Sequence, residues 1–107
     1  MREHGGWVYM LASKRNGTLY TGVTNDLLSR VSDHKEGVGS NFTRKYGVTW
    51  LVWFEFHETI ESAIQRETSI KRWRRKWKLD LIEAKNPDWQ DLFEELTKPQ
   101  PLPEWAR

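Results

Sequence analysis

Two short segments joined by a tight-turn sequence constrain the fold of this chain most. Residues 7–12 and 18–23 are rich in aromatic and β-branched side chains, and Arg15-Asn16-Gly17 between them is a strong hairpin signal. Strands joined by such a turn are antiparallel, whereas a parallel pair needs a crossover of a dozen residues or more. The turn therefore predicts a β-hairpin and excludes a doubly wound parallel sheet.

One helix, a loop and a third strand are predicted after the hairpin. Thr24 or Asn25 can cap the helix, and Gly37 supplies its left-handed end. A glycine-containing loop over 37–47 follows, and then a long strand over 48–57. Alternation in this strand predicts one shared face for four side chains, those of Trp50, Val52, Phe54 and Phe56.

Helices follow the third strand. Thr59 can cap the second helix, helical spacing resumes around Trp77, and Asn86-Pro87 stops it. Asp88 is expected to cap a short helix over 89–97. The order ββαβα plus C-terminal helices predicts an α+β fold, a small three-stranded antiparallel sheet flanked by helices.

A chain of 107 residues makes one domain, which we place at residues 1–98, with a proline-rich tail at 99–107. The absence of cysteine excludes disulfide scaffolds and thiolate zinc sites, and it fits a reducing compartment. The longest apolar run, residues 7–12, is too short to span a bilayer, and the charged start does not resemble a signal peptide. We therefore expect a cytoplasmic protein without a membrane partner.

Positive charge is concentrated in residues 66–78, which carry seven Lys/Arg, one acidic residue and two tryptophans. Such interleaving is typical of a surface that binds a nucleic-acid backbone. A solvated helix face balanced by the acidic C-terminus explains the charge equally well. The cations expected at a nucleic-acid surface are Arg44 and Lys45 of the loop, together with Lys71, Arg72, Arg74 and Arg75.

Glu67 is the most informative single residue. The apolar positions of the second helix are 60, 63, 64 and 70, and position 67 completes their i, i+3, i+4, i+7 series. A carboxylate on a buried stripe needs a cation or a metal ion as its partner. Pattern alone favours an ion pair, with Arg30 or Arg66 as the partner.

Arg30 and His34 are four residues apart, so they share one face of the first helix. A guanidinium there can hold a phosphate in a fixed fork, and an imidazole can handle a proton near neutral pH. An exposed pair on the helix rim is the commoner meaning of this spacing.

Hairpin register decides whether Tyr9 and Tyr20 face one site. A four-residue loop makes Leu11 oppose Tyr20 and puts Tyr9 diagonally beside it on the same face. A two-residue loop also keeps both on one face, whereas a three-residue loop separates them unless a bulge intervenes. Two core tyrosines are the default alternative.

These residues together resemble the GIY-YIG nuclease superfamily. They are most similar to its small stand-alone members, which are related to the UvrC N-terminal domain and to homing endonucleases. The resemblance covers roughly residues 6–90 and is carried by Trp7-Val8-Tyr9, Tyr20-Thr21-Gly22, Arg30 with His34, and Glu67. The first tripeptide lacks the glycine that names the family, and Thr21 replaces isoleucine in the second. Asn86 matches a late asparagine that lines the site in several relatives.

The resemblance implies a structure-selective or weakly sequence-specific endonuclease that hydrolyses phosphodiester bonds, with DNA favoured over RNA as its substrate and DNA repair as its expected setting. It implies that Glu67 holds one Mg²⁺ or Mn²⁺ and that Tyr9 either accepts a proton from the attacking water or orients that water, with His34 as relay. Arg30 would stabilise the phosphoryl oxygens, and Tyr20 would position the scissile phosphate. The site would lie on the sheet face between the first and second helices.

Two other classes of function remain open. The first is a nucleic-acid-binding module that keeps the fold without turnover. The second is a protein-interaction domain built on exposed tryptophans, namely Trp73, Trp77 and Trp105.

Overall fold

The structure is a computed structural model that describes residues 5–97 and Trp105. Its strands are β1 (Gly6–Ala12), β2 (Leu19–Thr24) and β3 (Trp50–His57). Its helices are α1 (Leu27–Lys35), α2 (Asn41–Tyr46), α3 (Ile60–Lys71), α4 (Arg75–Lys85) and α5 (Phe93–Thr97). The expected proline-rich tail lies outside the described residues, apart from Trp105.

The strands form one antiparallel sheet in the order β2-β1-β3, which confirms the predicted α+β class. The β1–β2 hairpin has the four-residue loop: the Ser13 amide donates to the Thr18 carbonyl at 3.0 Å, and Leu11 pairs with Tyr20. Asn16 supplies the left-handed turn conformation at φ 59°. The register that places both tyrosines on one face is therefore confirmed.

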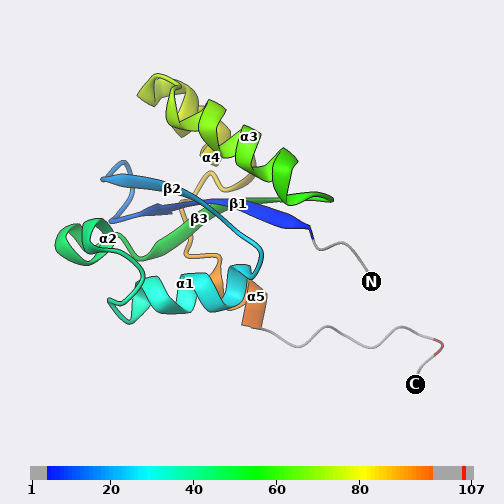
Figure 1. The fold of residues 1–107 in the computed structure, drawn as a ribbon. Helices are drawn as coiled ribbons and strands as arrows, with labels where there is room; N and C mark the ends of the chain where they lie inside the picture. Colours follow the sequence, from blue (N-terminus) through cyan, green and yellow to red (C-terminus); the bar gives the residue numbers. More distant parts are fainter. Residues whose placement is uncertain (1–4, 98–104, 106–107) are drawn as a thin grey trace.

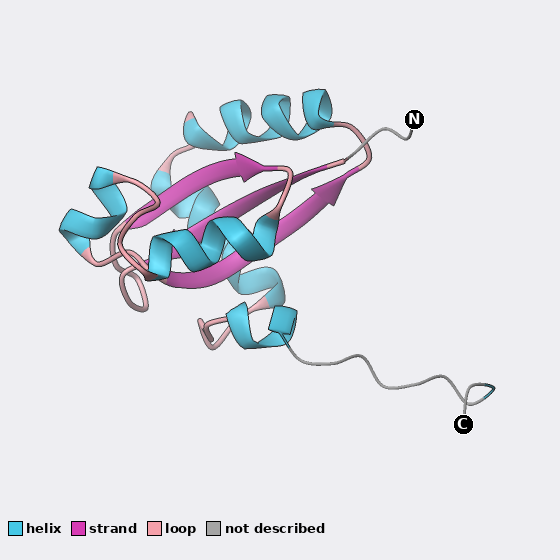
Figure 2. Cartoon of the chain, turned by 60° about the horizontal axis from the view of Figure 1, so that its bottom comes forward, coloured by secondary structure: helices cyan, strands magenta, loops and turns pink. Residues whose placement is uncertain are grey.

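Helices cover both faces of the sheet (Figure 1). Val8 and Met10 of β1 point to the face that α3 and α4 cover, whereas Tyr9 and Leu11 point to the face of α1 and α5. Figure 2 shows α1 lying across its face of the sheet, with α3 beyond the opposite face. Each face has its own apolar core, because alternate side chains of β1 point in opposite directions.

A bulge in β3 makes the predicted common face wrong. Met10 pairs with Trp53 and Leu11 with Leu51, so Val52 is an extra residue in β3. Val52 then packs with the α3 side of the sheet, whereas Phe54 packs on the α1 side. Strict alternation fails at the bulge, which the sequence does not mark.

The first helix begins one or two residues later than predicted. Its cap is Asp26, whose carboxylate accepts from the Ser29 amide at 3.2 Å. Thr24 instead accepts from the Asp26 amide at 3.0 Å, which fixes the turn before the helix. Gly37 does have the expected left-handed conformation, at φ 82°.

Two other helices differ from expectation. Residues 41–46, predicted as loop, form α2, which Ser40 caps by accepting from the Thr43 amide at 3.1 Å. The last helix covers 93–97 rather than 89–97, because Trp89 has a φ of 56° that helical backbone excludes. The Thr59 cap of α3 and the end of α4 at Lys85 are as predicted. None of the helices described is long and apolar enough to cross a bilayer.

Candidate functional site

A buried hydrogen bond joins Tyr9 of β1 to His34 of α1. The Tyr9 hydroxyl lies 3.0 Å from His34 Nε2, and the two residues are 1% and 0% exposed. His34 Nδ1 lies 2.9 Å from Thr43 Oγ1 on α2. The sequence therefore brings β1, α1 and α2 together through polar side chains rather than through apolar packing alone.

One arrangement of protons satisfies every partner in this chain of hydrogen bonds, including Ser40 Oγ, which lies 3.0 Å from Thr43 Oγ1. Thr43 Oγ1 is 3.2 Å from the Ser40 carbonyl oxygen, which can only accept. A Thr43 hydroxyl that donates to this carbonyl accepts from His34 Nδ1, so the Nε2 atom of the neutral ring holds a lone pair. The Tyr9 hydroxyl then donates to His34 Nε2.

Arg30 stands beside the same hydroxyl. Its guanidinium donates to the Gly39 carbonyl at 3.0 Å, a contact that fixes its position at the start of the loop leading to α2. Its proximity to Tyr9, as a hydrogen-bond partner and a charge, raises the pKa of Arg30. A guanidinium has no acceptor atom, so in a hydrogen bond between these two groups Arg30 donates and the Tyr9 oxygen accepts.

Burial decides the charge state of Tyr9 and His34. Burial, assisted by the nearby Tyr20, raises the pKa of Tyr9 to about 12, although the hydrogen bond and charge of Arg30 act in the opposite direction. Burial and the charge of Arg30 lower the pKa of His34 below its ordinary value of 6.5. At neutral pH the site therefore holds a neutral phenol, a neutral imidazole and a cationic guanidinium.

Tyr20 on β2 completes this group of four. Its ring centroid lies 6.3 Å from that of Tyr9 and 5.2 Å from that of His34. The Phe42 ring of α2 also stacks on Tyr20, with a centroid distance of 6.1 Å. Tyr20 and Arg30 are partly exposed, whereas Tyr9 and His34 lie behind them. A ligand would therefore meet Tyr20 and Arg30 first.

Two glycines make room for the group. A Cβ atom on Gly22 would lie 2.5 Å from the Tyr9 hydroxyl oxygen, and one on Gly39 would lie 2.4 Å from His34 Nδ1. Gly22 pairs directly with Tyr9 across the hairpin, so the phenol lies against the backbone of the edge strand. Either position needs a residue without a side chain because the Tyr9–His34 pair fills that space.

Glu67 approaches from the other side of the sheet. It lies on α3, and the expectation that all five residues share one sheet face between the two helices was wrong, because α1 and α3 cover opposite faces (Figure 1). Its side chain is 13% exposed and pairs with Lys71 at 2.7 Å. Its charge nevertheless contributes to the raised pKa of Tyr9.

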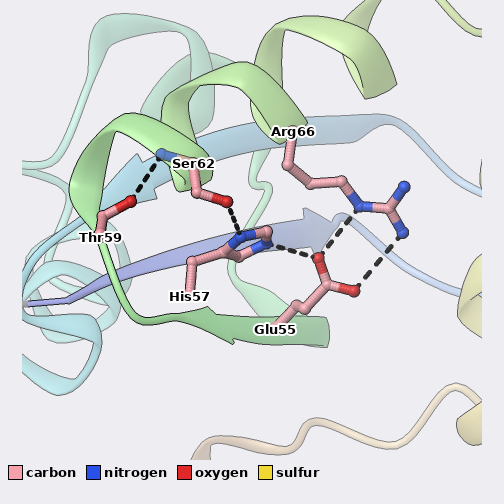
Figure 3. A network of polar contacts seen from close by, with 5 residues as sticks. All are labelled: Glu55, His57, Thr59, Ser62 and Arg66. Atoms are coloured by element: carbon pink, nitrogen blue, oxygen red, sulfur yellow. Dashed lines mark hydrogen bonds and ion pairs between the residues drawn. The ribbon is translucent and has the colours of Figure 1, made fainter.

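The partner of Glu67 also differs from the two arginines considered for it. Arg66 instead donates from Nε to Glu55 of β3 at 3.0 Å (Figure 3). Ile64, expected on the buried stripe, is exposed. The buried stripe of α3 thus runs through Ala63, Glu67 and Ile70, and it keeps the carboxylate close to the sheet.

The donor set around Glu67 suits a water-rich metal site rather than a closed one. In residues 5–97 there is no group of three or more His, Cys, Asp or Glu side chains that could hold a metal ion. Mg²⁺ is commonly bound by one or two carboxylates, with water and substrate phosphates completing its shell. A single, partly exposed carboxylate fits that pattern.

Asn86 belongs to another part of the molecule. Its side-chain amide donates to the Val52 and Gln90 carbonyls at 3.1 and 2.9 Å, beside β3. Tyr20 lies on β2, at the opposite edge of the sheet. Asn86 closes the turn after α4 and is not brought to the tyrosines.

The six cations predicted to bind nucleic acid are all exposed. Those of α2 flank the group of four: Arg44 donates to the Asn41 side chain at 3.1 Å, and Lys45 lies over the Tyr46 ring. Arg75 donates to two carbonyls of the β1–β2 turn, those of Asn16 and Gly17, at 2.8 and 2.7 Å. The start of α4 is thereby tied to the hairpin that carries the tyrosines.

Residues around α2 were the main omission from the sequence prediction. Thr43 orients His34, Ser40 caps the helix that carries Thr43, and Phe42 stacks on Tyr20. Ser40 as a cap and Gly47 as a left-handed terminator bracket this six-residue helix. Ser40 and Gly47 were the sequence features that could have indicated this helix, although a short segment between glycines is equally typical of a loop.

Comparison with known proteins identifies the family of this chain. A model of the GIY-YIG catalytic domain matches residues 5–80. A UPF0213 protein of Clostridium perfringens is 44% identical over 80 residues, which are 75% of this chain and 85% of the relative. A UPF0213 protein of Staphylococcus aureus is 39% identical over 70 residues, 65% of this chain and 85% of the relative.

A solved structure shows the same fold. The solution NMR structure of a UPF0213 protein from Bacillus halodurans is 30% identical, with a TM-score of 0.52, and the match covers 81% of this chain and 92% of that one. The family match includes all five residues from Tyr9 to Glu67. This chain belongs to the GIY-YIG family.

Proposed function

We propose that this protein is a divalent-metal-dependent endonuclease that hydrolyses phosphodiester bonds in DNA. One observation carries the proposal. Tyr9, Tyr20, Arg30 and His34 come from three elements and gather on one face of the sheet, in a chain of the GIY-YIG family. Buried polar side chains are costly to gather unless they serve as partners or perform chemistry.

Arg30 and Tyr20 would contact the scissile phosphate. Both are partly exposed and lie in front of the buried pair. The Arg30 guanidinium would donate to phosphoryl oxygens as negative charge develops there, and the Gly39 carbonyl holds it in place. The Tyr20 hydroxyl would fix the orientation of the phosphate.

Tyr9 and His34 would move the proton of the attacking water. A phenol with a pKa of about 12 stays protonated at neutral pH, so it is a weak base on its own. It can accept a proton from water only while passing its own proton to another group. His34 Nε2, 3.0 Å away and neutral, is the acceptor in that relay.

Glu67 would hold the divalent ion, Mg²⁺ or Mn²⁺, together with phosphate oxygens and water. When bound, the ion would neutralise charge on the phosphate and on the leaving oxygen. The Lys71 ammonium pairs with the Glu67 carboxylate at 2.7 Å, so this ion pair must break when the ion binds. As a 53% exposed side chain at the helix end, Lys71 is free to turn toward a DNA phosphate instead.

A cleavage assay tests this proposal. Purified protein is incubated with single-stranded, duplex, branched and flap DNA and with RNA, with and without Mg²⁺ or Mn²⁺. Glu67→Ala should abolish cleavage while DNA binding remains, and Arg30→Ala should slow cleavage about 100-fold or more. Glu61→Ala, an exposed change on the same helix, is the matched control. Wild-type nicking by Glu67→Ala would refute the metal role.

A second function is favoured by the Glu67–Lys71 ion pair itself. A carboxylate already neutralised by its neighbour needs no metal, so the chain can be a nucleic-acid-binding module without turnover. This alternative predicts salt-sensitive DNA binding and no cleavage of any substrate at any metal concentration.

A further inference from the structure

A shallow apolar groove lies within the most basic part of the chain, away from the group of four. Its volume is about 430 Å³, and its lining is Trp73, Trp77, Asp80 and Leu81. Trp73 and Leu81 are partly buried against the core and form the inner part of the lining, whereas Trp77 is 50% exposed. The volume is toward the small end of the range for ligand sites, about 300–1,000 Å³.

Cations surround the two indoles. The Arg66 guanidinium lies 5.4 Å from the Trp73 ring centroid, and that of Arg74 lies 5.2 Å from the ring of Trp77. The two rings meet edge to face, with centroids 6.2 Å apart and an 81° angle between their planes. Each guanidinium lies over one of the rings, and the Trp77 indole is still half exposed. Aromatic surface together with arginine is the combination used to hold single-stranded nucleic acids.

The charge around the groove selects its occupant. Residues 66–78 have a net charge of +6, and the one acidic side chain of the lining, Asp80, is paired with Lys76 at 3.0 Å. The centre of a protein interface is poor in lysine and other charged groups, whereas a nucleotide brings one apolar base with one anionic phosphate. A nucleotide therefore matches both the lining and its surroundings.

We propose that an unpaired base stacks on the exposed Trp77 indole in this groove, and that this protein prefers nucleic acids with single-stranded segments. The proposal rests on the proposed function only in requiring that a nucleic acid binds. Lys71 lies between this groove and Glu67 along α3, and Arg75 ties the start of α4 to the tyrosine hairpin. A strand with one base in the groove would have its neighbouring phosphates beside Lys71, next to the candidate site.

Binding of fluorescein-labelled oligonucleotides without divalent metal tests the groove. Trp77→Ala should weaken binding of oligo(dT) by roughly 5- to 100-fold, the effect of losing one stacked base, and should change binding of a continuous duplex less than about twofold. Trp77→Phe keeps a ring and should retain most of the affinity. Trp105→Ala removes a more exposed indole and should change neither.

Salt dependence separates stacking from charge. Trp77→Ala should lower the affinity for oligo(dT) at every salt concentration and leave the slope of log K against log salt unchanged. Arg74→Ala should reduce that slope by about 0.7, one phosphate contact on a single strand. Circular dichroism and thermal unfolding of each variant verify its fold.

Two results would overturn the proposed role of the groove: an equal loss of affinity for oligo(dT) and for duplex DNA, or a folded Trp77→Ala protein that binds oligo(dT) as tightly as the wild type. Either result would favour an apolar side chain of a partner protein as the occupant of the groove. Because no metal and no cleavage are involved, these outcomes are independent of nuclease activity. A protein that binds oligo(dT) through Trp77 but never cuts DNA would refute the proposed function and support the groove.

Discussion

At the scale of single residues, the buried Tyr9–His34 pair is the feature that distinguishes this core from an ordinary apolar one. Its hydroxyl and imidazole are fully buried, so each depends on the other and on Thr43 for hydrogen bonding. Leaving either group without a partner costs about 1–3 kcal/mol. The pair is therefore both a structural requirement and the candidate proton relay.

The raised pKa of Tyr9 predicts a loss of stability at high pH. The folded pKa of about 12 exceeds the ordinary value of 10.0, so the unfolded chain loses this proton first. The stabilising effect is complete below pH 10 and disappears as the pH rises through 12, a loss of roughly 2–3 kcal/mol. Urea unfolding at pH 8 to 12 should show it in the wild type and not in Tyr9→Phe.

Tyr46→Phe is the control for this titration, because Tyr46 is exposed and its replacement should leave the extra loss in place. The same variant comparison cancels the titration of the other tyrosines and of the lysines. If Tyr9→Phe and the wild type lose stability in parallel from pH 10 to 12, the phenol is not held neutral by its surroundings.

At the scale of elements, a polar network fastens α3 to the end of β3 (Figure 3). Glu55 accepts from Arg66 at 3.0 Å and lies 2.7 Å from His57 Nε2, while His57 Nδ1 lies 2.7 Å from Ser62 Oγ. Burial alone would raise the pKa of Glu55, but hydrogen bonds with His57 and Arg66 outweigh it and lower the pKa. The network holds the helix that carries Glu67 and the basic segment.

This network predicts a contribution to stability that acid removes. A folded pKa below the ordinary value of 4.5 makes the contribution complete above pH 4.5 and lost as the pH falls through the folded pKa. Because the Glu55 side chain is 35% exposed, solvent screening limits it to less than about 1 kcal/mol. Glu55→Gln should be less stable than wild type at pH 7 and equally stable near pH 2.

The matched change is Glu58→Gln, at an exposed position just before α3. Thermal unfolding of both variants from pH 2 to 7 measures the difference. A deficit of Glu55→Gln that persists undiminished at pH 2 would mean that the variant loses packing rather than charge.

The same elements show what the sequence could predict. The turn sequence at Asn16-Gly17 predicted the hairpin, and hairpin geometry limited the register to a few loop lengths, two of which put Tyr9 and Tyr20 on one face. The structure selects the four-residue loop. The bulge at Val52 was not predictable in this way, because it depends on pairing between distant strands. The helix α2 was missed because its local signals, Ser40 and Gly47, are equally typical of a loop. Thr43 reaches His34 only once α2 exists, so this orienting contact was hidden too.

At the scale of the whole molecule, the sheet divides the candidate machinery. The group of four lies on the side of the sheet that α1 covers. Glu67 lies on α3, which covers the other side together with the start of the basic segment. Helical periodicity identified Glu67 as an inward-facing acid, which its 13% exposure agrees with, but periodicity says nothing about which sheet face a helix covers. Which face of the sheet a helix covers depends on chain topology and packing.

Lys71 can pair either with the Glu67 carboxylate or with a DNA phosphate, so the two compete for its ammonium group. Its ammonium pairs with Glu67 at 2.7 Å, yet it also belongs to the basic segment expected to bind phosphates. Removing it should free the carboxylate for a divalent ion while removing one contact to DNA. Lys71→Ala is therefore expected to lower the Mg²⁺ concentration for half-maximal cleavage about two- to fivefold, the usual worth of an exposed ion pair.

The same variant should bind duplex DNA with a salt slope smaller by about 0.9. Lys71→Arg keeps both the charge and the pairing, so it should shift neither quantity much. Cleavage at a series of Mg²⁺ concentrations and binding at a series of salt concentrations give the two measurements on the same protein. An unchanged Mg²⁺ requirement together with the smaller salt slope would mean that Lys71 serves DNA alone and that the Glu67 carboxylate does not take the ion.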